Sequence, residues 1–167
     1  QTESLHNPGH GFTPFSYEVL SDIGLPSPDE LRRAESEYPS EIQRIYLALP
    51  ETDPRVAGLA KQVTASAATN YDRALAVEAY LRANFTYSLD PVGIEPGDPI
   101  GTFLFKARTG YCEYFAAAMA VMLRTQGIPA RLVNGFQTGT YNRVGKDFIV
   151  RGRDAHSWVE VHFPNYG

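Results

Sequence analysis

The stretch Tyr114–Leu123 is apolar at nearly every position, and it constrains the fold more than any other part of the sequence. It is about half as long as the roughly 20 apolar residues that a membrane-spanning helix needs. A helix that is apolar on all sides belongs in the interior of a domain. Gly127 at the expected C′ position and Pro129 just beyond it predict where this helix ends. We therefore expect one buried central helix.

Helical patterns precede this segment. Ser27-Pro28-Asp29-Glu30 predicts a capping box at the start of a first helix, and Ser40-Glu41-Ile42-Gln43 repeats the pattern for a second. A third helix is expected from Asp53 to about Ala68. Thr69 or Asn70 then caps a fourth, whose apolar residues recur at helical spacing. We also expect one or two helical turns at 103–107.

The apolar period changes from 3.6 to 2 after the central helix. Strands are expected at about 130–138, 146–152 and 155–163, with a turn region around 141–145. Shorter strands are expected at 85–89 and at 15–20, and a loop at 90–99 because of its Pro and Gly content. The order of helices, buried helix and antiparallel meander predicts an α+β fold, with the helices packed on one side of a sheet.

The length and charge of the chain limit the possible functions. The 167 residues suit one domain, which we place at 28–167, with 1–27 as an N-terminal extension or the tail of a preceding segment. The net charge of −4 and the lack of any Lys/Arg run argue against a nucleic-acid partner. No nucleotide-binding or metal-ligand motif is present, so we expect neither a cofactor nor a metal.

Cys112 is the single cysteine, and it lies at the predicted start of the central helix. Unpaired N–H groups and the positive end of the helix dipole stabilise a thiolate there, and the same groups can stabilise an oxyanion. The alternative interpretation is a small buried apolar residue without a chemical role.

His156 is the candidate base for Cys112, because a thiol nucleophile needs a group that accepts its proton and later delivers it to the leaving group. Strict alternation along this strand places Ser157, Val159, Val161 and Phe163 toward the core, and Asp154, His156, Trp158, Glu160 and His162 on the opposite face. A surface histidine without function remains the alternative. His162 is expected to be exposed.

Three blocks of residues resemble the transglutaminase-like superfamily. They are Gly110–Ala116 around the cysteine, Gln126–Arg131 after the central helix, and Asp154–Val161 around the histidine. Their order and spacing agree with the family over about residues 70–167. The resemblance is greatest to the bacterial members that project such a domain from a multi-spanning membrane protein.

This resemblance implies a papain-like core in which the helix bearing Cys112 packs against the sheet bearing His156. It implies acyl transfer through a Cys112 acyl-enzyme, with an amide of a protein or peptide as substrate. Transglutaminases, peptidases and amidases all occur in the family. It also implies a location outside the cytoplasmic membrane and a membrane-anchored parent protein. The oligomeric state stays open.

The family has a third catalytic residue, an Asp on the strand after the histidine, and this sequence stops at Asn165-Tyr166-Gly167, just short of it. We expect that the chain is truncated before that residue, or that its activity is impaired because the imidazole is not oriented. Asp154 is a weaker substitute for it.

Two aromatic residues are candidates for the substrate groove, Trp158 by alternation from His156 and Tyr111 by its place next to Cys112. Plain packing is the alternative for Trp158. A rival function for the whole chain is a catalytically silent module that binds a peptide or a cell-wall component. A third interpretation is a structural piece that regulates a membrane partner.

Overall fold

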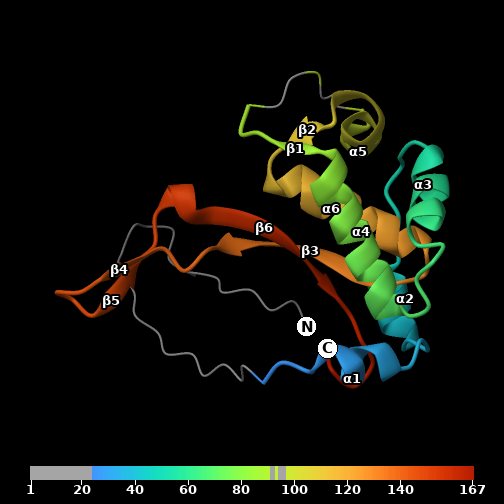
Figure 1. Ribbon diagram of the computed structural model, residues 1–167, viewed down its shortest axis with the longest axis horizontal. Helices are drawn as coiled ribbons and strands as arrows, with labels where there is room; N and C mark the ends of the chain where they lie inside the picture. Colours follow the sequence, from blue (N-terminus) through green and yellow to red (C-terminus); the bar gives the residue numbers. More distant parts are fainter. Residues whose placement is uncertain (1–23, 91–92, 94–96) are drawn as a thin grey trace.

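The computed structural model describes residues 24–90, 93 and 97–167, and its elements combine helices and strands as an α+β fold requires (Figure 1). In chain order they are α1 (Pro28–Arg33), α2 (Ser40–Tyr46), α3 (Arg55–Val63), α4 (Asn70–Asn84), β1 (Thr86–Tyr87), α5 (Pro99–Thr102), the π-helical turn η1 (Phe103–Ala107), β2 (Thr109–Gly110), α6 (Cys112–Thr125), β3 (Ala130–Phe136), β4 (Thr140–Asn142), β5 (Asp147–Ile149), the 3-10 turn η2 (Gly152–Asp154) and β6 (Ala155–Val161).

The ends of the first helices test the predicted caps. The capping box of α1 is confirmed, because the Ser27 hydroxyl accepts from the Glu30 N–H at 3.4 Å and the Glu30 carboxylate accepts from the Ser27 N–H at 2.8 Å. The second box is wrong. Pro39 is the N-cap of α2, and the Gln43 side chain donates to the Tyr38 carbonyl at 2.7 Å instead of reaching Ser40.

The third and fourth helices were predicted with different success. Helix α3 ends at Val63, short of the expected Ala68, and Thr64 follows as its C-cap. The Thr64 hydroxyl donates to the Ala60 carbonyl at 2.9 Å, which satisfies an acceptor of the last turn. The predicted cap of α4 is confirmed, because Thr69 accepts from the Asp72 N–H at 3.1 Å.

The strands pair differently from the expected meander. β3 pairs directly with β6 in antiparallel register, from Ala130 opposite Val161 to Phe136 opposite Ala155. The strand predicted at 146–152 is the shorter β5, which pairs with β4 as a separate hairpin. A third pair, β1 with β2, is parallel. Local alternation indicates a strand but not its partner, which is why the meander was wrong.

Helix α6 is the centre of the packing, as its composition predicted (Figure 1). It contacts β3 and β6 on one side and α3 and α4 on another. Met122 and Leu123 have no exposed surface. Val159 and Val161 of β6 pack against the same apolar cluster, so the helix bearing the cysteine lies on the sheet bearing the histidine.

Some expectations fall on residues that the structure does not describe. The predicted strand at 15–20 and half of the loop at 90–99 lie outside the described residues. The division between 1–27 and 28–167 stays a prediction. Within the described segments, no helix combines the length and apolarity that crossing a bilayer requires.

Candidate active site

The segment that leads into Cys112 is fixed by the parallel pair β1–β2. The Thr86 N–H donates to the Arg108 carbonyl and the Ser88 N–H donates to the Gly110 carbonyl, both at 2.9 Å. Cys112 comes two residues after Gly110. The start of α6 is therefore anchored to the chain segment that follows α4.

Gly110 is required by close packing rather than by an unusual backbone angle. A Cβ atom at this position would lie 2.9 Å from the Cβ of Tyr114 and 3.1 Å from the ring of Phe103. Real Cβ atoms do not make such contacts with rigid neighbours, so any larger residue would displace the first turn of α6. This explains why the motif around the cysteine begins with glycine.

Cys112 is the first residue of α6, and its free thiol is half-buried. Tyr111 is the N-cap in extended conformation, and its side chain does not cap the helix. The N–H groups of the first turn are thus not occupied by a capping side chain. At this end of the helix they favour a negative charge, whether on a thiolate or on an oxyanion.

Cys112 and His156 line the same open cleft of about 480 Å³. His156 is half-buried in β6, opposite Gly135 of β3. The structure thus places both predicted residues in one cleft, and their catalytic roles stay a prediction. The lining comprises Glu78, Leu81, Arg82, Phe85, Tyr87, Cys112, Phe115, Ala116, Met119, His156, Ser157, Trp158 and Val159.

The cleft follows one edge of β6. Val159 packs against the core, as alternation predicted, and Trp158 belongs to the other face, yet both residues line the cleft. Ser157 also lines it, and its hydroxyl donates to Asn134 at 2.6 Å. Since β3 occupies one edge of β6, the cleft lies along the other, which has no partner strand among the described residues.

The two aromatic candidates differ in position. Trp158 lines the cleft, with 38% of its surface exposed. Tyr111 lies next to Cys112 but is not part of the lining, and its ring packs edge-on against Tyr114 with centroids 4.8 Å apart. Burial, then the neighbouring Tyr114 and Glu113, raise the pKa of Tyr111. Its role in substrate binding stays a prediction.

Asp154, the weaker candidate for orienting the histidine, lies in η2 rather than on the strand. Its carboxylate accepts from the Arg151 N–H at 2.7 Å and so stabilises the turn that precedes β6. This contact gives Asp154 a structural role in the turn, and its role in orienting His156 stays a prediction.

Helix α4 contributes cleft residues that the sequence analysis did not single out. Glu78 and Arg82 form an ion pair at 2.8 Å with i,i+4 spacing, which in a sequence indicates only a solvated helix surface. Phe115 and Met119 could have been found, because they lie three and seven residues after Cys112 on the same face of α6. They were instead assigned to the buried core, because they are apolar residues of the central helix.

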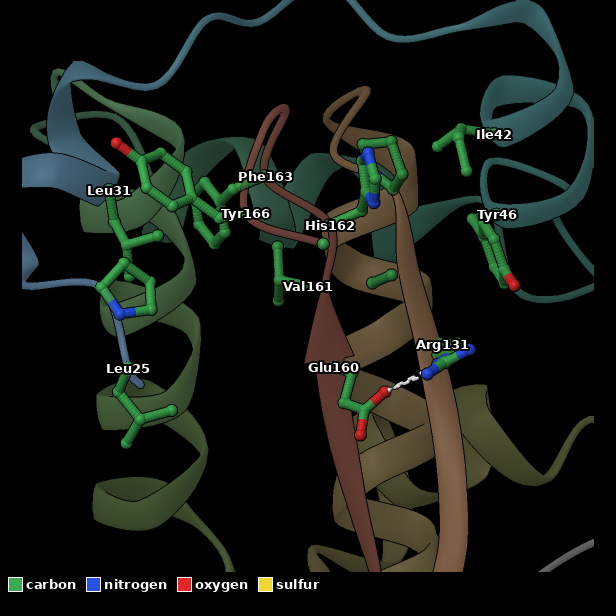
Figure 2. Close-up of a pocket in the computed structure, with 14 residues that line it drawn as sticks. Leu25, Leu31, Ile42, Tyr46, Arg131, Glu160, Val161, His162, Phe163 and Tyr166 are labelled. Carbon is green, nitrogen blue, oxygen red and sulfur yellow. Dashed lines mark hydrogen bonds and ion pairs between the residues drawn. The ribbon is translucent and has the colours of Figure 1, made fainter. Parts of the chain in front are cut away.

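A second cavity of about 730 Å³ lies at the other end of β6 (Figure 2). Figure 2 shows Leu25 and Leu31 on one side, Ile42 and Tyr46 on the other, and the Glu160–Arg131 pair between them. His162 is half-buried here, not exposed as expected, and burial lowers its pKa. Among the described residues, no group of three His, Cys, Asp or Glu side chains could hold a metal ion.

Comparison with known proteins identifies related sequences. A family model described as the transglutaminase-like superfamily matches residues 57–167. The chain is 41% identical to the uncharacterized protein YebA of Bacillus subtilis strain 168 over 163 residues, which covers 91% of this chain and 22% of YebA. It is 45% identical over 83 residues to a protein-glutamine gamma-glutamyltransferase of Pseudomonas aeruginosa, which covers 50% of this chain and 12% of that protein.

A solved structure resembles the fold. The periplasmic domain of TgpA from Pseudomonas aeruginosa, bound to ethylmercury, superposes with a TM-score of 0.70 at 36% identity. The match covers 80% of this chain and 48% of that domain. The chain thus spans about a fifth or less of the length of the curated relatives and about half of the periplasmic domain.

Proposed function

Because the chain belongs to the transglutaminase-like superfamily, we propose that it carries out thiol-dependent acyl transfer on amides of proteins or peptides. Cys112 is the nucleophile, and His156 is the general base and acid. The observation that supports this assignment is that both side chains line one open cleft at the N-terminus of α6.

The reaction follows from these two groups. His156 takes the proton of the Cys112 thiol, and the sulfur attacks the carbonyl carbon of the amide to form a tetrahedral oxyanion. The C–N bond then breaks, and His156 gives its proton to the leaving ammonia or amine. The resulting thioester reacts with water or with a second amine, which restores the free thiol.

The first turn of α6 stabilises the charge that develops in this reaction. No side chain caps the N–H groups of this turn, and we expect the oxyanion of the tetrahedral intermediate at this end of the helix, because Cys112 is its first residue. Such donors do not need to reorganise during the reaction, since the helix holds them in place. The same end of the helix favours the thiolate before attack.

The relatives suggest the substrate and the location. One is named as acting on protein glutamine, and the similar solved structure is a periplasmic domain. We extend both to this chain, so that the acyl donor is a protein or peptide amide such as a glutamine side chain. The domain then works outside the cytoplasmic membrane as part of a membrane-anchored protein.

An activated ester tests the proposal without knowledge of the natural substrate. With p-nitrophenyl acetate, we expect a burst of nitrophenolate and an acetyl group on Cys112, both detectable by absorbance and intact mass. Replacing Cys112→Ala should abolish the burst, and His156→Ala should slow it by roughly a hundredfold or more. Acetylation no faster than that of a short peptide containing residues 108–116 would overturn the assignment and favour a silent binding module.

A further inference from the structure

Residues 136–153, which we call the hairpin arm, contain β4, β5 and their flanks, and they project from the rest of the described molecule (Figure 1). β4 and β5 pair with each other, and no other described helix or strand packs extensively against either of them. No residue of the arm lines either of the two cavities described above. The arm is therefore a convex feature, whereas a site that encloses a small molecule is concave.

The hairpin arm concentrates apolar surface that the core does not use. Fourteen large apolar residues are exposed in the described part of the chain, and six of them belong to the arm: Phe136, Tyr141, Val144, Phe148, Ile149 and Val150. Tyr141 and Phe148 form a cross-strand pair with ring centroids 5.1 Å apart, which stabilises the hairpin itself. Val144 at the turn is 95% exposed, so packing within the hairpin does not explain it. Exposed apolar residues that cluster in this way indicate an interaction surface.

The same segment carries positive charge in an acidic chain. It has one acidic residue, Asp147, and four exposed basic residues, Arg143, Lys146, Arg151 and Arg153. The arm thus has a net charge of +3, whereas the whole chain has −4, so the remaining residues carry −7. Among the described residues, no ion pair uses any of these four basic side chains. Their charges are therefore available to an anionic partner.

We propose that the hairpin arm docks on the surface of an anionic lipid bilayer. Val144 enters the headgroup layer, and Arg143 and Lys146 bind lipid phosphates on either side of it. Apolar side chains interleaved with cations are the combination that membrane-surface segments use. A peptide partner is less suited to this surface, because it needs a groove or a long strand edge, and β4 and β5 have only three residues each.

The position of the arm in the fold gives this docking a consequence. The arm starts at Phe136, which is paired with Ala155, and His156 follows as the second residue of β6. A docked arm therefore holds the end of the sheet that carries His156 close to the lipid surface. The projection of the arm also keeps the acidic remainder of the chain away from the lipid, where salt screens repulsion beyond about 8–10 Å. The inference does not depend on acyl transfer, since it concerns a surface outside the cleft.

Sedimentation with vesicles tests the inference on the intact chain. We expect stronger binding to vesicles of equal parts phosphatidylcholine and phosphatidylglycerol than to vesicles of phosphatidylcholine alone. Val144→Asp should lower the partition coefficient roughly tenfold or more, because a charge that the lipid repels replaces an apolar contact. Arg143→Gln combined with Lys146→Gln should lower it roughly tenfold to thirtyfold at low salt, since each cation near an anionic surface contributes about a fivefold effect.

The controls carry the same changes outside the arm. Leu89→Asp adds a carboxylate at a residue after β1 that is 79% exposed, and Arg44→Gln with Lys61→Gln removes two exposed charges from α2 and α3. Both controls should keep most of the wild-type binding. Absence of binding to the anionic vesicles, or equal losses in the arm and control variants, would overturn the inference. Unchanged binding by Val144→Asp would also overturn it, because the arm is then a general anion site for an acidic protein or a nucleic acid.

Discussion

Asp98 shows how a single side chain connects two segments that are distant in the sequence. Its carboxylate accepts from the Thr52 hydroxyl, the Asp53 N–H and the Gly101 N–H, each at 2.8 Å. Burial raises the pKa of Asp98, but the hydrogen bonds from Gly101, Thr52 and Asp53 outweigh it, so the pKa is below its usual value. The ionised carboxylate thereby ties the segment before α3 to the start of α5.

We predict that Asp98→Asn lowers the free energy of unfolding at pH 7 by about 1.5–3 kcal/mol, because one oxygen becomes an NH₂ group that faces an N–H donor. A depressed pKa in the folded state means that the stabilisation is present above the unfolded value of about 3.9 and is lost as the pH falls through the folded value. The difference between the two proteins should therefore shrink below about pH 4. Urea unfolding at pH 7 and pH 3 measures it, with exposed Asp90→Asn as the control. A difference that is the same at both pH values would contradict this account.

The site residues differ in how far the sequence could predict them. Cys112 and His156 were predicted from motifs that carry the chemistry in a few consecutive residues, and their catalytic roles stay a proposal. Arg82 of α4 could not be identified, because its i,i+4 ion pair indicates only a solvated helix surface. Tyr111 was selected because it is adjacent to Cys112. Its ring instead packs against Tyr114, and such a contact cannot be read from adjacency in the sequence.

At the scale of elements, helix α4 begins with a network around Thr69. Its hydroxyl accepts from the Asp72 N–H at 3.1 Å and donates to the Asp72 carboxylate at 2.7 Å. Asp72 also accepts from Arg32 of α1 at 2.9 Å. The contact with Thr69, and then that with Arg32, lower the pKa of Asp72. The cap thus contributes to both the start of α4 and the docking of α1.

We predict that Thr69→Ala destabilises the protein by about 1 kcal/mol, the usual loss for a missing N-cap. Ser66→Ala is the matched control, because Ser66 is exposed three residues earlier and caps no helix. Thermal unfolding of both variants gives the comparison. If the two variants unfold at the same temperature, the cap does not stabilise α4 in the way described.

Elements were predicted well where local chemistry decides them and poorly where pairing decides them. The Ser27 cap, the Thr69 cap and the apolar helix follow from neighbouring residues. The direct pairing of β3 with β6 depends on contacts that are distant in the sequence, and it leaves β4 and β5 to pair with each other as a local hairpin. Period-2 alternation is the same whichever strand becomes the partner.

At the scale of the whole molecule, α6 is packed from several sides, and its two methionines experience different surroundings. Met122 is completely buried in the core, whereas Met119 lies three residues earlier and lines the cleft. The same substitution at the two positions therefore compares the core with the cleft.

We predict that Met122→Ala lowers the free energy of unfolding by about 2–5 kcal/mol, because it leaves a cavity in a close-packed interior. Met119→Ala should cost less, since water from the cleft can fill the space. Denaturant unfolding of each variant measures the loss. A larger loss from Met119→Ala than from Met122→Ala would mean that the core is not centred where the structure places it.

The central claim is that Cys112 and His156 act as a pair, and thiol alkylation tests it most directly. The rate of Cys112 modification by iodoacetamide should be measured by mass spectrometry from pH 5 to 9, with His156→Ala alongside. We predict modification at pH 6 well above that of a free cysteine, whose pKa is about 8.5, and a rate profile that changes when the imidazole is removed. A profile like that of a free thiol, identical in both proteins, would contradict the pairing and leave the cleft as a binding site without catalysis.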